Sequence, residues 1–397
     1  MIWKKLLITC IVLSNILLSG CQGSKEIDTI ALAISIGIDK VGDEYFVTYQ
    51  ILNPKAIVSQ KASNESPIFL YTERGKDLFE IIRRITTISP RKIYNSHIRM
   101  IVFSEEVARE GINGFMDFFL RDHEFRTDFY FVVAKGATAN KILQSVTPLE
   151  SVSGMEMYNS IQSSKKAWTP TKAVEIIELV NKLISDGVNP VLSAVELVEE
   201  ESNSDSIEGL KQSVVSKLKL SGLYAFKKDK LVGYLNESES EGFNYITGHV
   251  KDTAGFVQFG KHNRITIEIT KAKSKIKAYM LKGKPAINVA IDLGVNINAE
   301  TGNLDISTEE NTDLISRLFE EEIKRKCEYS IMKAQGELKT DVFGFGEEIH
   351  RTYPKLWKKI KLNWNEEFTK LPVSVTVQAH VKGLGVITKS FFSKEIY

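Results

Sequence analysis

The sequence predicts an α+β fold of mixed multi-domain architecture, with an antiparallel sheet packed with helices in the C-terminal half. Three observations point to this fold class. The chain has 397 residues, of which 43% are hydrophobic, enough for about two or three domains. In several segments apolar residues alternate with polar or small ones, which is typical of strands. In others they recur every three or four residues, which is typical of helices.

The first 20 residues have the pattern of a secretory signal. Lys4 and Lys5 precede an apolar run at 6–18, and this run ends in small residues just before Cys21. The run is shorter than the roughly 17 to 25 residues of a membrane-spanning helix. We therefore expect residues 1–20 to be a signal peptide that is removed from the mature protein.

Residues 18–21 (LSGC) resemble a bacterial lipobox, in which a peptidase cuts between Gly20 and Cys21 once the thiol carries a diacylglyceryl group. The resemblance implies a covalent diacylglycerol and an N-acyl lipid on Cys21. Two long acyl chains contribute on the order of 20 kcal/mol of partitioning into a bilayer. The prediction is a lipid-anchored protein. The alternative is an ordinary signal, cut elsewhere, that leaves Cys21 unmodified.

The N-terminal half mixes strands and helices. Apolar residues occupy every second position of 30–38, and a second strand at 45–52 follows a polar turn, which together predict a hairpin. Helical spacing at 78–88 ends before Pro90. The other predicted elements are an exposed loop at 53–67, strands at 97–103 and 128–134, a helix capped by Ser104, and a helix at 170–184.

An acidic, serine-rich run at 199–208 (EEESNSDSIE) lacks apolar periodicity, which is typical of a linker. It sets the predicted domain boundary. The predicted divisions are 1–20 (signal peptide), 21–198 (N-terminal domain), 199–214 (linker) and 215–397 (C-terminal α+β domain).

The C-terminal half has longer strands with one polar face, at 265–269, 287–297 and 373–381. Such strands fit an antiparallel sheet whose other face is covered by helices. A helix at 311–335 is the predicted cover, and Cys327 lies on its apolar stripe as a core residue. The opposite face offers three (i, i+4) pairs: Glu320 with Lys324, Glu321 with Arg325, and Glu322 with Lys326.

No pattern of catalytic chemistry stands out. The six histidines are scattered without zinc-site spacing, so no metal site is predicted. The cluster at 121–124 (RDHE) could pair an acid with a base, although a charged loop is the favoured interpretation. Gly344-Phe345-Gly346 is too short for a phosphate loop. A net charge of +2 argues against nucleic acid as a partner. We therefore predict a protein that is not an enzyme.

The segment 353–368 (YPKLWKKIKLNWNEEF) mixes lysines with aromatic residues. Apolar residues four apart, from Leu356 to Phe368, favour a helix packed on the core. The remaining interpretation is contact with a protein partner or with anionic lipid headgroups. The candidates for that contact are Trp357, Lys358 and Lys359.

Several motifs resemble the Ger(x)C family of spore germination lipoproteins, the C subunits of nutrient germinant receptors. They are the lipobox followed by Glu26-Ile27, 34–39 (ISIGID), 97–112 (HIRMIVFSEEVAREGI) and 344–364 (GFGEEIHRTYPKLWKKIKLNW). The match spans nearly the whole chain in the family's order. Where the family usually has Trp-Asp after the cysteine, this chain has Gln22-Gly23.

The resemblance implies a lipoprotein that is not an enzyme and binds no cofactor beyond its lipid. It would lie on the outer face of the spore inner membrane and assemble with two integral membrane subunits of the A and B types. It also implies a third domain, whose borders stay open. One alternative is a lipid-anchored solute-binding protein of a transporter, which predicts two lobes of parallel β-α units. Another is a cell-wall hydrolase, which needs paired carboxylates or a metal.

Overall fold

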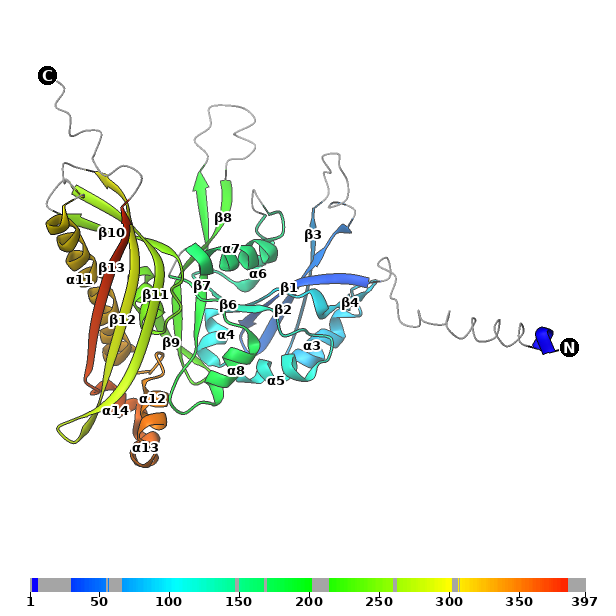
Figure 1. Ribbon diagram of the computed structural model, residues 1–397. Coiled ribbons are helices and arrows are strands. Elements are labelled where there is room, and N and C mark those ends of the chain that lie inside the picture. The colour runs from blue at the N-terminus through cyan, green and yellow to red at the C-terminus, as the bar shows by residue number, and fades with distance from the viewer. Residues whose placement is uncertain are drawn as a thin grey trace, which may run out of the picture.

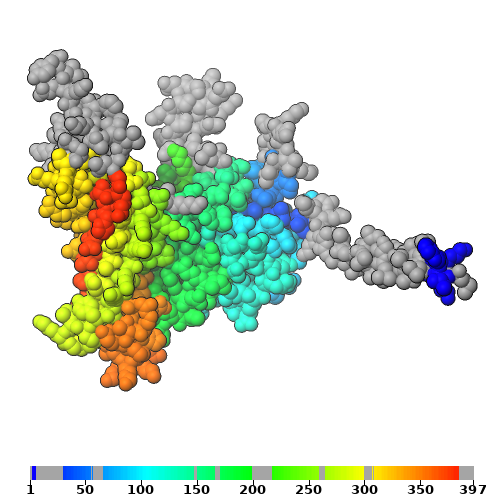
Figure 2. Space-filling view, viewed as in Figure 1, coloured from blue at the N-terminus to red at the C-terminus, as the bar shows by residue number. Residues whose placement is uncertain are grey.

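The computed structural model describes residues 2–5, 30–54, 56, 66–146, 150–167, 170–201, 214–259, 263–301, 306 and 308–384. The described chain forms two sheets (Figure 1). We call residues 30–235, with the first sheet, the N-terminal part, and residues 237–384, with the second sheet, the C-terminal part. The two parts meet directly on the face seen in Figure 2.

The first sheet has nine strands in the order β3-β2-β1-β5-β6-β7-β8-β9, and β4 pairs with β1. Its centre is parallel, from β1 through β5 and β6 to β7, and β4 also pairs parallel with β1. The remaining strands, β2, β3, β8 and β9, pair antiparallel with their neighbours. The strands are β1 (Ile30–Val41), β2 (Glu44–Leu52), β3 (Ile68–Gly75), β4 (Lys92–Tyr94), β5 (Met100–Ser104), β6 (Tyr130–Ala134), β7 (Val191–Glu201), β8 (Val214–Lys227) and β9 (Lys230–Leu235).

Helices cover both faces of the first sheet (Figure 1). On β5, Ile101 and Phe103 pack with residues of α3, α5 and α8, whereas Met100 and Val102 pack with residues of α6 and α7. The central strands are therefore buried on both faces, as expected of parallel strands. The helices are α3 (Leu78–Ile85), η2 (Asn95–His97), α4 (Glu105–Glu110), α5 (Asn113–Arg121), α6 (Ala139–Gln144), α7 (Ser153–Ala167) and α8 (Ile176–Ile184).

The second sheet has the order β10-β11-β12-β13. Three strands are antiparallel as predicted, but β13 runs parallel to β12. The chain returns to the sheet through the intervening helices, and a crossover of this kind joins parallel strands. The elements are α10 (Glu237–Ile246), β10 (Thr253–Phe259), β11 (Asn263–Leu281), β12 (Lys284–Thr301), α11 (Glu309–Lys333), η3 (Ala334–Leu338), α12 (Phe345–Thr352), α13 (Pro354–Ile360), η4 (Lys361–Asn363), α14 (Trp364–Thr369) and β13 (Val373–Leu384).

Helix α11 covers the second sheet as predicted. Its stripe from Ile315 to Ile331 is buried, and Cys327 is fully buried on it. Burial raises the pKa of the Cys327 thiol, so the thiol stays neutral. The predicted ion pairs are mostly wrong. Only Glu322 approaches Lys326, at 4.0 Å, because Glu320 accepts a hydrogen bond from the backbone of Ala379 at 2.8 Å and Arg325 binds Glu322 at 2.6 Å.

Several helices begin or end at residues other than those predicted. The helix at 78–88 ends at Ile85, and the one at 170–184 begins only at Ile176. The stripe from Leu356 to Phe368 is split between α13 and α14, because a turn of 3₁₀ helix at Lys361–Asn363 interrupts the helix. The helix after Ser104 is confirmed, and the Ser104 hydroxyl accepts the Val107 N–H at 3.3 Å.

Both described ends of the predicted linker, 199–201 and Val214, belong to strands of the first sheet. Strands β7 and β8 pair from Val191↔Ala225 to Glu201↔Val214, so they flank residues 202–213, which lie outside the described residues. Since β8 and β9 complete the first sheet, the change of sheet comes after Leu235 rather than at 199–214. One apolar face of β7, β8 and β9 joins the core of the second sheet, which fixes the two parts together.

The 34–39 motif (ISIGID) holds helix α6 against β1. The Asp39 carboxylate accepts the N–H groups of Ala139 and Asn140 at 2.7 and 2.8 Å, at the helix N-terminus. A Cβ at Gly37 would lie 3.0 Å from Leu143 and 3.1 Å from Ala139. Gly37 thus permits the close approach that Asp39 fixes, which is a structural role.

Candidate functional site

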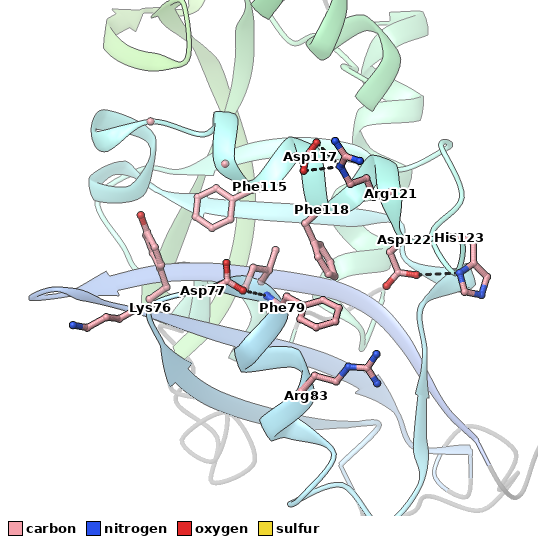
Figure 3. Close-up of a pocket in the computed structure, with 14 residues that line it drawn as sticks. Lys76, Asp77, Phe79, Arg83, Phe115, Asp117, Phe118, Arg121, Asp122 and His123 are labelled. Atoms are coloured by element: carbon pink, nitrogen blue, oxygen red, sulfur yellow. Dashed lines mark hydrogen bonds and ion pairs between the residues drawn. The ribbon is translucent and has the colours of Figure 1, made fainter.

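A groove lies between α3 and α5, with a volume of about 690 Å³ (Figure 3). Phe79 and Phe118 face it from the two helices, and Phe79 is 56% exposed. Lys76, Arg83 and Asp117 also line it. The groove combines apolar walls with charges of both signs, so its charge selects neither acidic nor basic ligands.

The 121–124 cluster lies at one end of this groove. Arg121 pairs with Asp117 at 2.8 Å, and Asp122 accepts the Glu124 N–H at 2.9 Å. Glu124 forms an ion pair with Lys92, and the His123 side chain is 94% exposed. Residues 122–124 follow α5 and precede β6, so they form the charged loop that the sequence favours.

The most buried charge lies where the two parts meet. Asp341 is fully buried and accepts N–H groups from Phe343, Gly344, Phe345 and Gly346 at 2.8 to 3.3 Å, and from the Trp364 indole at 3.2 Å. Its backbone carbonyl accepts the N–H of Asn189, in the N-terminal part, at 2.7 Å. Burial raises the pKa of Asp341 to about 6, whereas the backbone N–H groups act in the opposite direction.

Two glycines let the parts approach closely beside Asp341. A Cβ at Gly346 would lie 2.7 Å from the Trp364 indole nitrogen and 2.8 Å from Gly187 Cα. The Glu347 N–H donates to the Gly187 carbonyl at 3.3 Å across the same contact. The 344–364 motif therefore forms the junction between the parts. Sequence reasoning missed Asp341 because it examined Gly344-Phe345-Gly346 only as a phosphate loop, although an Asp just before glycines and a helix signals a cap.

We expect Gly346→Ala to lower the free energy of unfolding by about 1 to 3 kcal/mol, because the new methyl group overpacks the junction. Urea denaturation measures this effect. Gly336→Ala is the matched control, since no atom lies within 4 Å of a Cβ there. Equal stability of the two variants would show that the junction tolerates the added methyl group.

The residues predicted for contact divide between core and surface. Trp357 is buried, 3% exposed, and packs on His350 and Trp364, so its prediction as a contact residue is corrected. Lys358 and Lys359 are exposed on α13, which protrudes in orange at the lower end of Figure 2. Gly20 and Cys21 lie outside the described residues.

Within the described ranges, His, Cys, Asp and Glu side chains form no group of three that could hold a metal ion. In the same part of the chain, none of the helices is both long and apolar enough to cross a bilayer.

Comparison with known proteins gives matches over both parts. Residues 23–197 match the family described as "Spore germination protein N-terminal domain", and residues 221–385 match "Spore germination B3/ GerAC like, C-terminal". These ranges divide the chain near the predicted linker, although the first sheet continues to Leu235.

Relatives match over nearly their full length. Spore germination protein KC of Bacillus subtilis (strain 168) is 26% identical, with 97% of each chain covered. Spore germination protein B3 of the same organism is 24% identical, over 94% of this chain and 96% of that protein. The crystal structure of the GerBC protein shares the fold, with a TM-score of 0.54 and 21% identity over 87% of this chain and 96% of that one. The chain belongs to the GerAC family of spore germination proteins.

Proposed function

We propose that this protein is a membrane-anchored lipoprotein subunit of a spore nutrient germinant receptor, required for the response to nutrients during germination. The observation that carries the proposal is the pair of family matches, which together cover both parts of the chain. Diacylglycerol and an N-acyl chain on Cys21 would hold it on the outer face of the spore inner membrane, as the 18–21 motif suggests.

The proposed mode of action is contact rather than catalysis. The densest ionisable cluster, at 121–124, consists of surface pairs. Asp341, the buried carboxylate, is enclosed by hydrogen-bond donors and serves the junction. A general acid or base must instead reach a substrate proton. These arrangements support a receptor subunit that works through its neighbours.

The partners we propose are two integral membrane subunits, of the A and B types, and the bilayer itself. The exposed face of α13 is the proposed contact. Within the described part of the chain, Lys355, Lys358 and Lys359 form no ion pair, and Leu362 beside them is 88% exposed. A large apolar side chain among unpaired cations suits a partner that offers acidic groups around an apolar surface.

We expect the double substitution Lys358→Glu and Lys359→Glu to reduce by at least tenfold the amount of membrane subunits that copurify from detergent-solubilised spore membranes. The charge reversal would place the two glutamates opposite the acidic groups proposed for the partner, and like charges across a contact repel each other. The double substitution Lys273→Glu and Lys275→Glu on β11 is the control, because it reverses two exposed charges elsewhere. Equal copurification of both double variants would remove α13 from the contact.

The fold does not favour the solute-binding alternative. That class has two lobes of alternating parallel β-α units. Here the second sheet pairs β10, β11 and β12 antiparallel.

A further inference from the structure

A small cavity lies between the two parts, away from the groove of Figure 3. Its volume is about 110 Å³. The N-terminal part contributes Lys172 and the end of α7, and the C-terminal part contributes α10 and the loop between α10 and β10. The lining residues used below are Lys165, Lys172, His249, Lys251 and Asp252.

Lys172 brings a buried positive charge to this cavity. Its side chain is 2% exposed, and its ammonium lies 2.5 Å from the Glu178 carboxylate. The Lys182 ammonium lies 3.2 Å from the same carboxylate oxygen. Two cations therefore share one carboxylate, which leaves one positive charge uncompensated within this cluster. An uncompensated charge at a buried position is costly.

The position of Lys172 is fixed by the backbone. Its N–H donates to the Ser193 hydroxyl at 2.9 Å, and this hydroxyl donates to the Lys172 carbonyl at 2.9 Å. The ammonium also lies 5.6 Å from the centre of the Phe243 ring, on α10. The charge is thus held at the contact between the two parts.

Other positive groups line the cavity at exposed positions. Lys165 lies on α7, and Lys251 lies in the loop after α10. Asp252 is the acidic residue of the lining. Burial, and then the neighbouring Lys182, lower the pKa of Lys172. Since an opposite charge nearby favours the charged form of a lysine, an anion in the cavity would stabilise protonated Lys172.

We propose that this cavity binds a small oxyanion, a carboxylate or a phosphate, which bridges Lys172 of the N-terminal part and the His249 loop of the C-terminal part. The cavity is smaller than the about 150 Å³ that accommodates benzene. It therefore admits an ion of roughly four to six non-hydrogen atoms. The bound anion supplies the negative charge that Glu178 cannot give to both lysines.

Isothermal titration calorimetry on the full chain in a zwitterionic detergent tests the proposal. Sodium acetate and inorganic phosphate are titrated separately, with chloride held at the same ionic strength as the reference. We expect saturable binding of at least one of the two, and their relative affinities tell a carboxylate site from a phosphate site. Saturation by neither would overturn the proposal.

Lys172→Met keeps the length of the side chain without its charge, and Glu178 retains Lys182 as a partner. We expect at least tenfold weaker binding. Lys251→Glu changes an exposed position, and we expect it to weaken binding at least threefold. This variant tests the proposal if Lys172→Met does not fold. Lys273→Met, on β11, is the control and should bind as the unsubstituted protein does. Unchanged affinity in the cavity variants would overturn the proposal. The measurement needs no receptor partner, so its failure leaves the proposed receptor role untouched.

Discussion

Asp341→Ala is expected to lower the free energy of unfolding by about 3 kcal/mol or more, because several buried donors lose a charged acceptor and one such hydrogen bond contributes about 1.5 to 3 kcal/mol. The methyl group would leave four backbone N–H groups and the Trp364 indole without their acceptor. An unsatisfied buried donor costs about 1 to 3 kcal/mol, and such costs are not additive. Urea denaturation, followed by tryptophan fluorescence and circular dichroism, measures the loss.

Two further variants distinguish the effect of the Asp341 charge on stability from the effect of removing any carboxylate. Asp341→Asn keeps one acceptor oxygen but turns an amide donor toward backbone donors, so we expect an intermediate loss. Asp313→Ala removes an exposed carboxylate from α11 and should change stability by less than about 0.5 kcal/mol. A loss for Asp341→Ala no larger than for Asp313→Ala would contradict the role of Asp341 at the junction.

The same carboxyl group gives stability a pH dependence of defined sign. Burial raises the folded pKa to about 6 from the ordinary 3.8. Between pH 3.8 and about 6 the Asp341 carboxyl group keeps its proton in the folded protein but has lost it in the unfolded chain. The stability that protonated Asp341 contributes is therefore fully present below about pH 4 and is lost as the pH rises to about 6. The change amounts to about 3 kcal/mol. Asp341→Asn cannot ionise, and we expect it to lack this slope; an identical slope would assign the pH dependence to other groups.

Local patterns predicted the elements well. The apolar stripe of α11, the alternation in β1, β11 and β12, and the Ser104 cap are properties of neighbouring residues, and all of them are confirmed. Pairings between distant segments were harder to predict. The parallel pairing of β13 and the β7–β8 pairing across 202–213 depend on how the chain returns, which periodicity does not encode.

For the candidate functional residues, too, the sequence showed local motifs but not the contacts that folding creates between distant segments. The 34–39 and 344–364 motifs were recognised from the sequence, yet their physical roles at α6 and at the junction appear only in the packed structure. Trp357 was a candidate for contact because its segment mixes lysines with aromatic residues, but it is buried, and the turn after Ile360 changes which side chains face the core. Lys172 gave no signal, since its burial depends on segments from both parts.

The proposed lipid anchor leads to the other large effect, the expected release of Cys21→Ala from the spore inner membrane. Two of the acyl chains proposed on Cys21 alone supply on the order of 20 kcal/mol of partitioning, and contacts of α13 would not replace the loss of the lipid. Folding should persist, because the buried core of the described residues begins at Ile30. Membrane fractionation, mass spectrometry of the amino-terminal peptide and nutrient-triggered germination are the measurements, with Ser24→Ala as the control. If Cys21→Ala stays in the membrane fraction as fully as Ser24→Ala, the anchor is elsewhere; if it is released but germination is unchanged, the receptor does not need this subunit at the bilayer.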